Sequence, residues 1–276
     1  MISRAIVACL AFLPAFASVT CAAQPETATL RVRFKLKGDV PKLPEIVPTR
    51  DKAFCGQRKI PDERLVVDPQ TRGIANVILY ADTSRRGTPL PHVAVEAKTV
   101  VLAQKHCRYE PRIVFLAVGD TLQVNNQDGV GHNANIQFLA NAPSSISAPP
   151  GAPYQVKLAK PEPAPIPIRC NIHPWMTGFA VILEHRYASA SDPSGLVEIK
   201  GLPPGEATFR AVHESSRLEA VIRDDKPAVW SGGRFKVTLQ PGLNDLGVVE
   251  VPVEAVMEAL EERLRATKRS GQAHGE

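Results

Sequence analysis

Long apolar stretches are missing from most of the sequence. Past the first 23 residues, no segment of the 276-residue chain is apolar enough to span a bilayer. A basic cluster is missing too, because the 33 Lys and Arg residues behind the formal charge of +5 are scattered along the chain. We therefore expect no transmembrane span and no nucleic-acid partner. The mild positive charge favours encounter with acidic partners, and ordinary solubility explains it equally well.

Aromatic residues are few, and helical periodicity is scarce before residue 252. The 25 prolines disfavour long helices and suit short strands joined by turns. Apolar and basic residues alternate over Thr29–Leu36, which is the pattern of a strand with one buried face. Similar short runs recur as far as residue 251, so we predict an all-β protein built from antiparallel sandwiches.

Residues 1–23 have the character of a signal peptide. Arg4 gives a positive start, an apolar run covers residues 5–19, and small residues precede a cleavage point that we expect near Ala23. The sequence thus predicts a periplasmic or secreted protein. Lipid attachment at Cys21 is the alternative, which the residues before it match poorly.

A candidate metal site lies in residues 166–183. Cys170, His173 and Met176 stand at positions i, i+3 and i+6, between short apolar runs that predict a strand, a tight loop and a strand. His132 supplies a second imidazole upstream. Two His and one Cys with a weak axial Met are typical of blue-copper electron-transfer sites.

The same residues resemble the copper loop of the cupredoxins, the blue copper proteins similar to amicyanin and plastocyanin. Gly119–Asn126 resembles their strand before the first His ligand, and His132-Asn133 resembles their His-Asn pair. Residues 170–176 resemble their Cys-x-x-His-x-x-Met loop, of the short type found in amicyanin. The resemblance covers roughly residues 99–184 and implies a Greek-key β-sandwich that binds copper.

The resemblance also implies one type-1 copper ion with three equatorial ligands and one axial ligand. The equatorial ligands are His132, Cys170 and His173, and the axial ligand is Met176. Asn133 is expected to donate its N–H to the Cys170 sulfur and to tie the two ligand loops together. A plain turn residue is the alternative for Asn133. Zinc, which leaves no role for Met176, and a metal-free site are the alternatives to copper.

Cys55 and Cys107 remain after the other cysteines are assigned. Cys9 and Cys21 lie in the predicted signal peptide, and Cys170 belongs to the metal set. Exported proteins meet an oxidising compartment, so we expect a disulfide between the remaining pair. Two separate buried thiols are the alternative.

Sequence character divides the exported chain into three parts. Residues 24–184 form the predicted cupredoxin-like domain, in which residues 24–98 are a β extension that shares or packs against its core. This arrangement resembles long cupredoxin-like proteins often labelled methylamine-utilisation proteins, although nothing in the sequence indicates amine chemistry. Residues 185–251 predict a small second β-sandwich, and residues 252–276 predict an amphipathic helix and a disordered tail.

The second sandwich resembles the carboxypeptidase regulatory-like, or transthyretin-like, domain. Three features carry the resemblance: an Asp-x-x-Gly turn ending at Gly195, a Leu-Pro-Pro-Gly reversal ending at Gly205, and His213-Glu214 at a strand end. The resemblance implies a non-catalytic accessory domain. His213 and Glu214 lack a third ligand, so a structural role is the favoured interpretation over metal binding.

The terminal helix is predicted from an apolar stripe. Its members are Val253, Val256, Met257, Leu260 and Leu264, and the disordered tail is expected from Thr267 onward.

A type-1 site has all its metal positions filled by protein atoms, which excludes substrate activation at the ion. An oxidase or nitrite reductase needs a second, open site built from clustered His, and the remaining His residues are not clustered. We therefore predict a one-electron carrier and no enzyme activity, with Pro174 and Trp175 as a docking patch for a redox partner protein. Simple packing is the alternative for Trp175. A copper-delivery protein and a cell-envelope binding protein are the alternatives.

Overall fold

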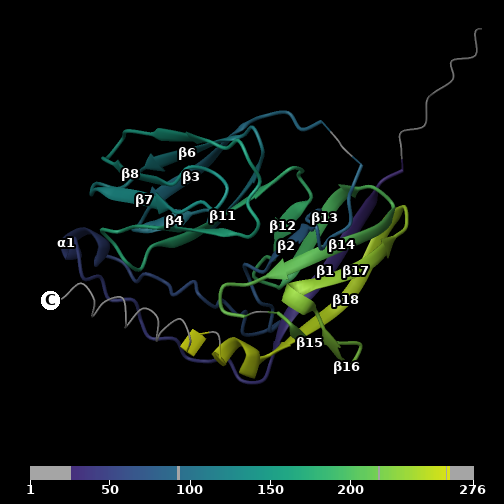
Figure 1. Ribbon diagram of the computed structural model, residues 1–276. Coiled ribbons are helices and arrows are strands. Elements are labelled where there is room, and N and C mark those ends of the chain that lie inside the picture. The colour runs from purple at the N-terminus through teal and green to yellow at the C-terminus, as the bar shows by residue number, and fades with distance from the viewer. Residues whose placement is uncertain (1–25, 92–93, 217, 259, 262–276) are drawn as a thin grey trace, which may run out of the picture.

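The computed structural model describes residues 26–91, 94–216, 218–258 and 260–261. Strands dominate this part of the chain and form four sheets, which pair into two sandwiches that lie side by side (Figure 1). Helix is limited to α1 (Lys52–Cys55), the 3₁₀ turn η1 (Ser231–Gly233) and a C-terminal stretch within these described residues. The prediction of an all-β fold is confirmed.

The first sandwich takes the middle of the chain. One sheet has the order β4-β3-β6-β9 and the other has the order β5-β11-β10-β7-β8. The strands are β3 (Thr99–Lys105), β4 (Arg108–Glu110), β5 (Ile113–Ala117), β6 (Thr121–Asn126), β7 (His132–Ile136), β8 (Ser144–Ala148), β9 (Tyr154–Lys157), β10 (Ile166–Arg169) and β11 (Thr177–Leu183). Alternate residues of β6 and β10 are buried between the sheets, as the period of two requires.

The second sandwich is built from both ends of the described chain. Its sheets have the orders β13-β1-β18-β15-β16 and β12-β2-β14-β17. The strands are β1 (Ala28–Lys37), β2 (Ile78–Ala81), β12 (Ala188–Ala190), β13 (Leu196–Leu202), β14 (Gly205–Val212), β15 (Ala220–Arg223), β16 (Lys226–Val229), β17 (Arg234–Leu239) and β18 (Gly242–Pro252). Phe34 of β1 and Phe209 of β14 belong to one continuous apolar core between the two sheets.

Two sequence predictions about the sheets need correction. The extension of residues 24–98 was expected in the cupredoxin-like domain, but β1 pairs with β13 and β18, and β2 pairs with β12 and β14. The sheets were expected to be antiparallel, but β1 runs parallel to β18, β3 to β6 and β5 to β11. Alternation along a strand reveals its buried face, whereas it contains no information about the partner strand or its direction.

Apolar and ionic contacts join the two sandwiches. Ile78 and Tyr80 of β2 share a buried cluster with Ile113, Phe179 and Val181 of β5 and β11. The guanidinium of Arg112 donates to Glu214 and to the Thr177 carbonyl. Glu214 therefore takes part in an ion pair between the sandwiches, and the His213-Glu214 pair belongs to none of the candidate metal groups among the described residues.

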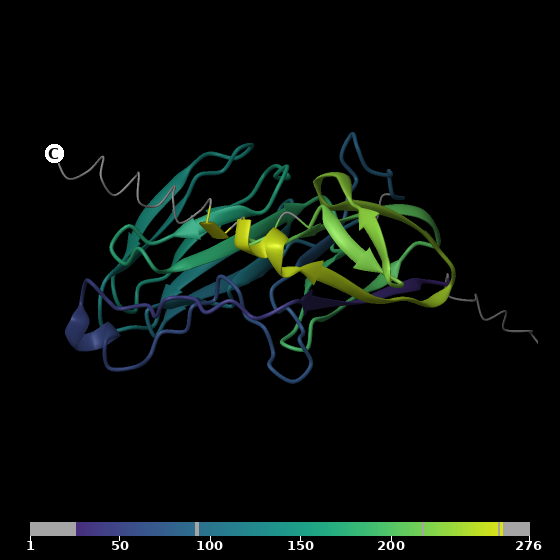
Figure 2. The same cartoon turned by 90° about the horizontal axis from the view of Figure 1, so that it is seen from below.

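The chain makes an excursion between β1 and β2 that reaches the first sandwich. We call residues 38–62 of this excursion the cover. Its helix α1 lies at the end of the first sandwich that is farthest from the second (Figures 1 and 2). Ile60 is buried in the core of the first sandwich, and Phe54 packs against that core. The cover is therefore part of the first sandwich, although both of its ends lead to the second.

The C-terminal stretch is helical over residues 253–258 and 260–261. Val256 and Leu260 are buried in the core of the second sandwich, and Val253 packs against it, so these members of the predicted stripe face the protein body, whereas Met257 is exposed. Leu264 and the tail from Thr267 lie outside the described residues, as do the signal peptide and Cys21. No helix in the described part of the chain is long and apolar enough to cross a membrane.

The strand order makes a testable prediction about the second sandwich. A fragment of residues 185–258 lacks β1 and β2, and β1 is the strand between β13 and β18. We expect this fragment to show no cooperative thermal transition by circular dichroism, because each sheet loses an interior strand. The full chain is the control, and a cooperative transition in the isolated fragment would contradict the observed topology.

Candidate metal centre

Two loops of the first sandwich bring the predicted equatorial ligands together. Cys170 and His173 lie in the tight loop between β10 and β11, and His132 begins β7, which pairs with β10. One ligand atom from each of these three residues falls within 4.8 Å of the others, and all three side chains are buried. The structure thus assembles the set that the sequence predicted, because neighbouring strands present their loops at the same end of the sheet.

Each of the two imidazoles is held by a carboxylate. His132 Nε2 lies 2.9 Å from Asp128 Oδ2, and His173 Nε2 lies 2.8 Å from Asp51 Oδ2. An ionised carboxylate only accepts hydrogen bonds, so both Nε2 atoms carry a proton and both Nδ1 atoms present a lone pair. Such carboxylate–histidine pairs are the usual support of metal ligands, since they fix the tautomer and the ring orientation.

The two Nδ1 atoms face one another at 2.8 Å, and His173 Nδ1 is 3.8 Å from Cys170 Sγ. With both protons placed on Nε2, two buried lone pairs and a sulfur atom converge without a hydrogen between the nitrogens. Convergent acceptors of this kind repel each other unless a cation or a proton lies among them. The residues present therefore fit a soft or borderline metal ion bound by two nitrogen atoms and one sulfur atom.

The environment of Cys170 favours the thiolate. Burial opposes ionisation, but the neighbouring His132 and His173 side chains and two backbone N–H donors outweigh it and lower the pKa of Cys170 to about 6. The backbone donors are Asn133 N at 3.5 Å and His173 N at 3.4 Å from Sγ. Burial alone lowers the pKa of His132, yet Asp128 and the Cys170 thiolate raise it above its ordinary value.

Asn133 makes the two contacts that the resemblance implied. Its N–H points to the Cys170 sulfur, and its side-chain Oδ1 accepts the backbone N–H of Asn171 at 2.6 Å. The second contact ties the start of β7 to the ligand loop across 38 residues of sequence. The positions of His132 and Cys170 are thereby coupled.

Met176 closes the ligand loop. Its N–H donates to the His173 carbonyl at 2.9 Å, and its own carbonyl accepts from the Cys170 N–H at 3.3 Å. The side chain is buried in the same apolar cluster as Cys170. The loop thus turns within seven residues and returns directly into β11.

Pro174 and Trp175, the predicted docking patch, differ in exposure. Pro174 is exposed, whereas Trp175 is half-buried and its indole N–H donates to the Cys107 carbonyl at 3.2 Å. The Trp175 ring lies 5.1 Å from the His173 ring. Trp175 therefore connects the ligand loop to the turn that carries Cys107.

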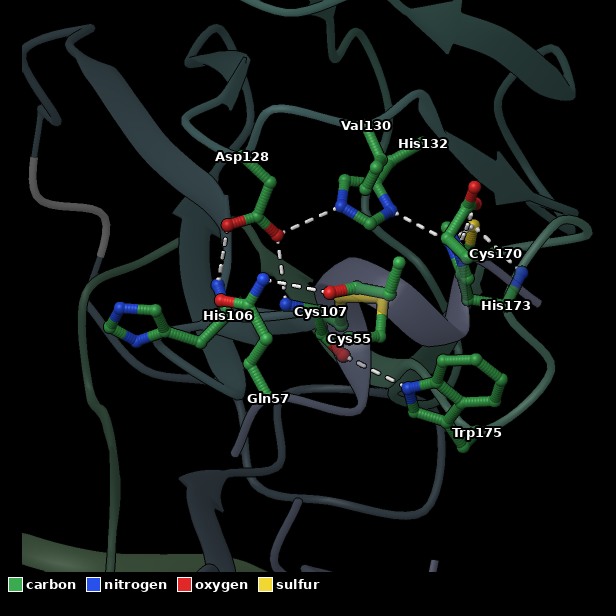
Figure 3. Close-up of a disulfide and its surroundings, with 12 residues drawn as sticks. Cys55, Gln57, His106, Cys107, Asp128, Val130, His132, Cys170, His173 and Trp175 are labelled. Atoms are coloured by element: carbon green, nitrogen blue, oxygen red, sulfur yellow. Dashed lines mark hydrogen bonds and ion pairs between the residues drawn. A yellow bond between two sulfur atoms is a disulfide. The ribbon is translucent and has the colours of Figure 1, made fainter. Parts of the chain in front are cut away.

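A disulfide joins Cys55 of α1 to Cys107, with 5.7 Å between the Cα atoms (Figure 3). Cys170 is the free cysteine of the described residues. The Cys107 N–H and the His106 N–H donate to the two oxygens of Asp128 at 2.8 and 2.7 Å. The disulfide and a ligand imidazole are thus linked through a single buried carboxylate.

Sequence reasoning missed the two carboxylates. Asp128 stands four residues before His132 in a turn, so proximity gave a usable signal. Asp51 is 122 residues from His173. The sequence offered one hint, because Asp51 lies close to Cys55, whose predicted disulfide restrains that segment. The Asp51 side chain makes no capping hydrogen bond to α1, although Asp at this position often does so.

No family model and no curated protein matches this chain. Among solved structures, a copper-containing nitrite reductase from Thermus scotoductus SA-01 aligns with 20% identity and a TM-score of 0.30, over 38% of this chain and 27% of that chain. A variant of amicyanin in its reduced Cu(I) form aligns with 24% identity and a TM-score of 0.27, over 33% of this chain and 85% of that chain.

A purple cupredoxin from Nitrosopumilus maritimus aligns with 18% identity and a TM-score of 0.26, over 30% of this chain and 97% of that chain. TM-scores of this size carry no argument about function. Any function of the site must therefore be inferred from the geometry of His132, Cys170 and His173.

The lowered pKa of Cys170 predicts the pH at which the metal-free protein ionises. A group with a depressed pKa is charged above that value, so we expect the thiolate to appear as the pH rises through about 6 rather than near 9. Ultraviolet absorbance of the thiolate measures this titration, and the Cys170→Ser variant provides the baseline. A difference spectrum that rises only near the ordinary thiol pKa would contradict the described hydrogen bonds.

Proposed function

We propose that the protein is a one-electron carrier with a single type-1 copper ion. His132 Nδ1, His173 Nδ1 and Cys170 Sγ are the equatorial ligands, and Met176 is the axial ligand. The observation that carries the proposal is the convergence of His132 Nδ1, His173 Nδ1 and Cys170 Sγ in one buried site, where the pKa of the thiol is lowered. When bound there, copper supplies a reversible one-electron couple.

The donor set favours copper over zinc. Soft sulfur ligands suit Cu(I), and imidazoles suit copper in both oxidation states. Structural zinc sites are completed by Cys and His, which leaves no role for a thioether. Met176 is buried on the same seven-residue loop as Cys170 and His173, so its thioether could complete the donor set.

The burial of the site favours electron transfer over catalysis. Both ligand imidazoles are fully buried and their outer nitrogens are held by Asp51 and Asp128, so a substrate has no path to an open ligand position. The other candidate metal group among the described residues shares His132, and its Cys107 is committed to the disulfide. The described residues thus contain no separate second site of the kind that a copper oxidase needs.

We place the protein outside the cytoplasm, in a periplasm or secreted. The predicted signal peptide of residues 1–23 and the disulfide support this location, since such bonds persist in oxidising compartments. N-terminal sequencing of the protein from its host tests it, and a chain that retains residues 1–23 would contradict cleavage. The second sandwich keeps the accessory role implied by its resemblance to carboxypeptidase regulatory-like domains.

Visible spectroscopy tests the copper assignment. The purified protein loaded with Cu(II) is expected to show an intense charge-transfer band from a copper–thiolate bond. Cyclic voltammetry should then show a reversible one-electron couple, which separates a carrier from a copper-delivery protein. Cys170→Ser should abolish the band, and a colourless Cu(II) form of the parent protein would exclude a type-1 site.

Asp128→Asn tests the support of a ligand imidazole. Because the neutral amide weakens the hold on the His132 Nε2 proton, we expect copper affinity to fall roughly 10–100-fold. Competition with a chelator measures the affinity. Asp39→Asn, an exposed acid in the cover, is the matched control and should leave the affinity unchanged. Equal affinities of the two variants would show that the Asp128–His132 contact does not orient the ligand.

A further inference from the structure

The cover shields the imidazole of His173 from solvent. The His173 side chain has 0% exposed area, and its Nε2 atom bonds to Asp51, whose side chain is 40% exposed. A partner protein therefore meets Asp51 and α1 where it would otherwise meet the imidazole.

Hydrogen bonds connect each ligand imidazole to a segment at the surface, either α1 or the turn that holds His106. His173 reaches the surface through Asp51, which begins α1. His132 reaches it through Asp128, whose oxygens accept the N–H groups of His106 and Cys107. The Cys55–Cys107 disulfide joins α1 to the turn that holds His106, so the two routes end on covalently linked segments (Figure 3).

The cover is fixed in this position by more than the disulfide. The ring of Phe54 lies close to Gly129 in the loop before His132, where an added Cβ would meet it at 3.4 Å. Ile46 pairs with Ile60, which is buried in the core of the first sandwich. These contacts hold the cover in one position over the site.

That surface is positively charged. Arg58, Lys105 and His106 line a cavity of about 260 Å³ beside the disulfide, and Arg50 and Lys52 flank Asp51 in sequence. Arg50, Lys52, Arg58 and Lys105 are the basic side chains of this set, and none of the four forms an ion pair within the described residues. The nearby acids are engaged: Asp51 and Asp128 bond to the ligand imidazoles, and Glu45 pairs with Lys59. The hydrogen bonds to the imidazoles leave the negative charges of Asp51 and Asp128 in place, so the four basic side chains exceed these two acids by two positive charges.

We propose that this face, formed by residues 50–58 and the turn at Lys105–Cys107, is the docking surface for a redox partner with an acidic surface. The proposal rests on the electron-carrier function proposed above. Docking there places an acidic partner over both hydrogen-bonded routes to the ligands. Each encounter transfers one electron. The donor loses this electron and is oxidised, and the acceptor gains it and is reduced.

The test uses one partner protein in two charge forms. Cytochrome c is basic, and succinylation of its lysines makes it acidic without changing its redox centre. Stopped-flow absorbance follows one-electron transfer from the reduced copper-loaded protein to each ferric form. The test variant is Arg58→Glu with Lys105→Glu. The control variant is Lys200→Glu with Lys226→Glu, which makes the same charge change at exposed positions of the second sandwich.

At low salt, we expect the test variant to react about tenfold more slowly than the parent with the acidic cytochrome and faster with the basic one. High salt should remove both differences, because it screens the charges. The control variant should keep the parent's ratio between the two cytochromes. Equal ratios in the test variant and the parent, or equal changes in test and control variants, would overturn the docking surface.

The copper–thiolate band distinguishes failure of the proposed electron-carrier function from failure of the docking surface alone. A parent protein without a copper–thiolate band would overturn the proposed function and the docking surface together. A parent that has the band and exchanges electrons, but shows no charge preference at the cover, would overturn the docking surface alone. If the double variant does not fold, Lys52→Glu on the exposed side of α1 gives the same comparison with Lys226→Glu as its control.

Discussion

The hydrogen bonds from Asp128 and Asp51 to the two imidazoles are the constraint on which the site depends. They keep both protons on Nε2 and therefore direct both Nδ1 lone pairs inward, toward each other and toward Cys170. The pKa of Cys170 is lowered to about 6 in this setting: burial opposes the thiolate, but the two neighbouring imidazoles and the backbone N–H groups of Asn133 and His173 outweigh it. Without the two carboxylates, these ring orientations would not be fixed.

The two carboxylates reach the site along different parts of the chain. Asp128 belongs to the first sandwich, while Asp51 arrives on the cover, which leaves the second sandwich after β1 and returns to it before β2. The first sandwich is itself an excursion between β2 and β12, which are neighbours in one sheet. The candidate metal site thus forms where two excursions from the second sandwich meet, and the Cys55–Cys107 disulfide fastens one to the other.

How much could be predicted depended on how local each signal was. Cys170, His173 and Met176 share one loop, so their spacing alone indicated a metal site, and the strands around them followed from alternation. Asp51 could not be predicted, because its contact with His173 depends on where a 25-residue excursion folds back. The sheet partners of β1 were missed for a related reason: alternation specified its buried face, but β13 and β18 are specified only by the assembled sandwich.

The pairing of Tyr80 with Ala188 has a consequence for the ancestry and engineering of the chain. The segment that contains strands β3–β11 leaves and returns at adjacent positions on antiparallel strands. A short hairpin turn is sufficient to bridge such positions. Strands β3–β11 therefore form an insertion that a short turn could replace in the second sandwich, whereas a transplanted insertion would also need the cover, which supplies Asp51 and Cys55.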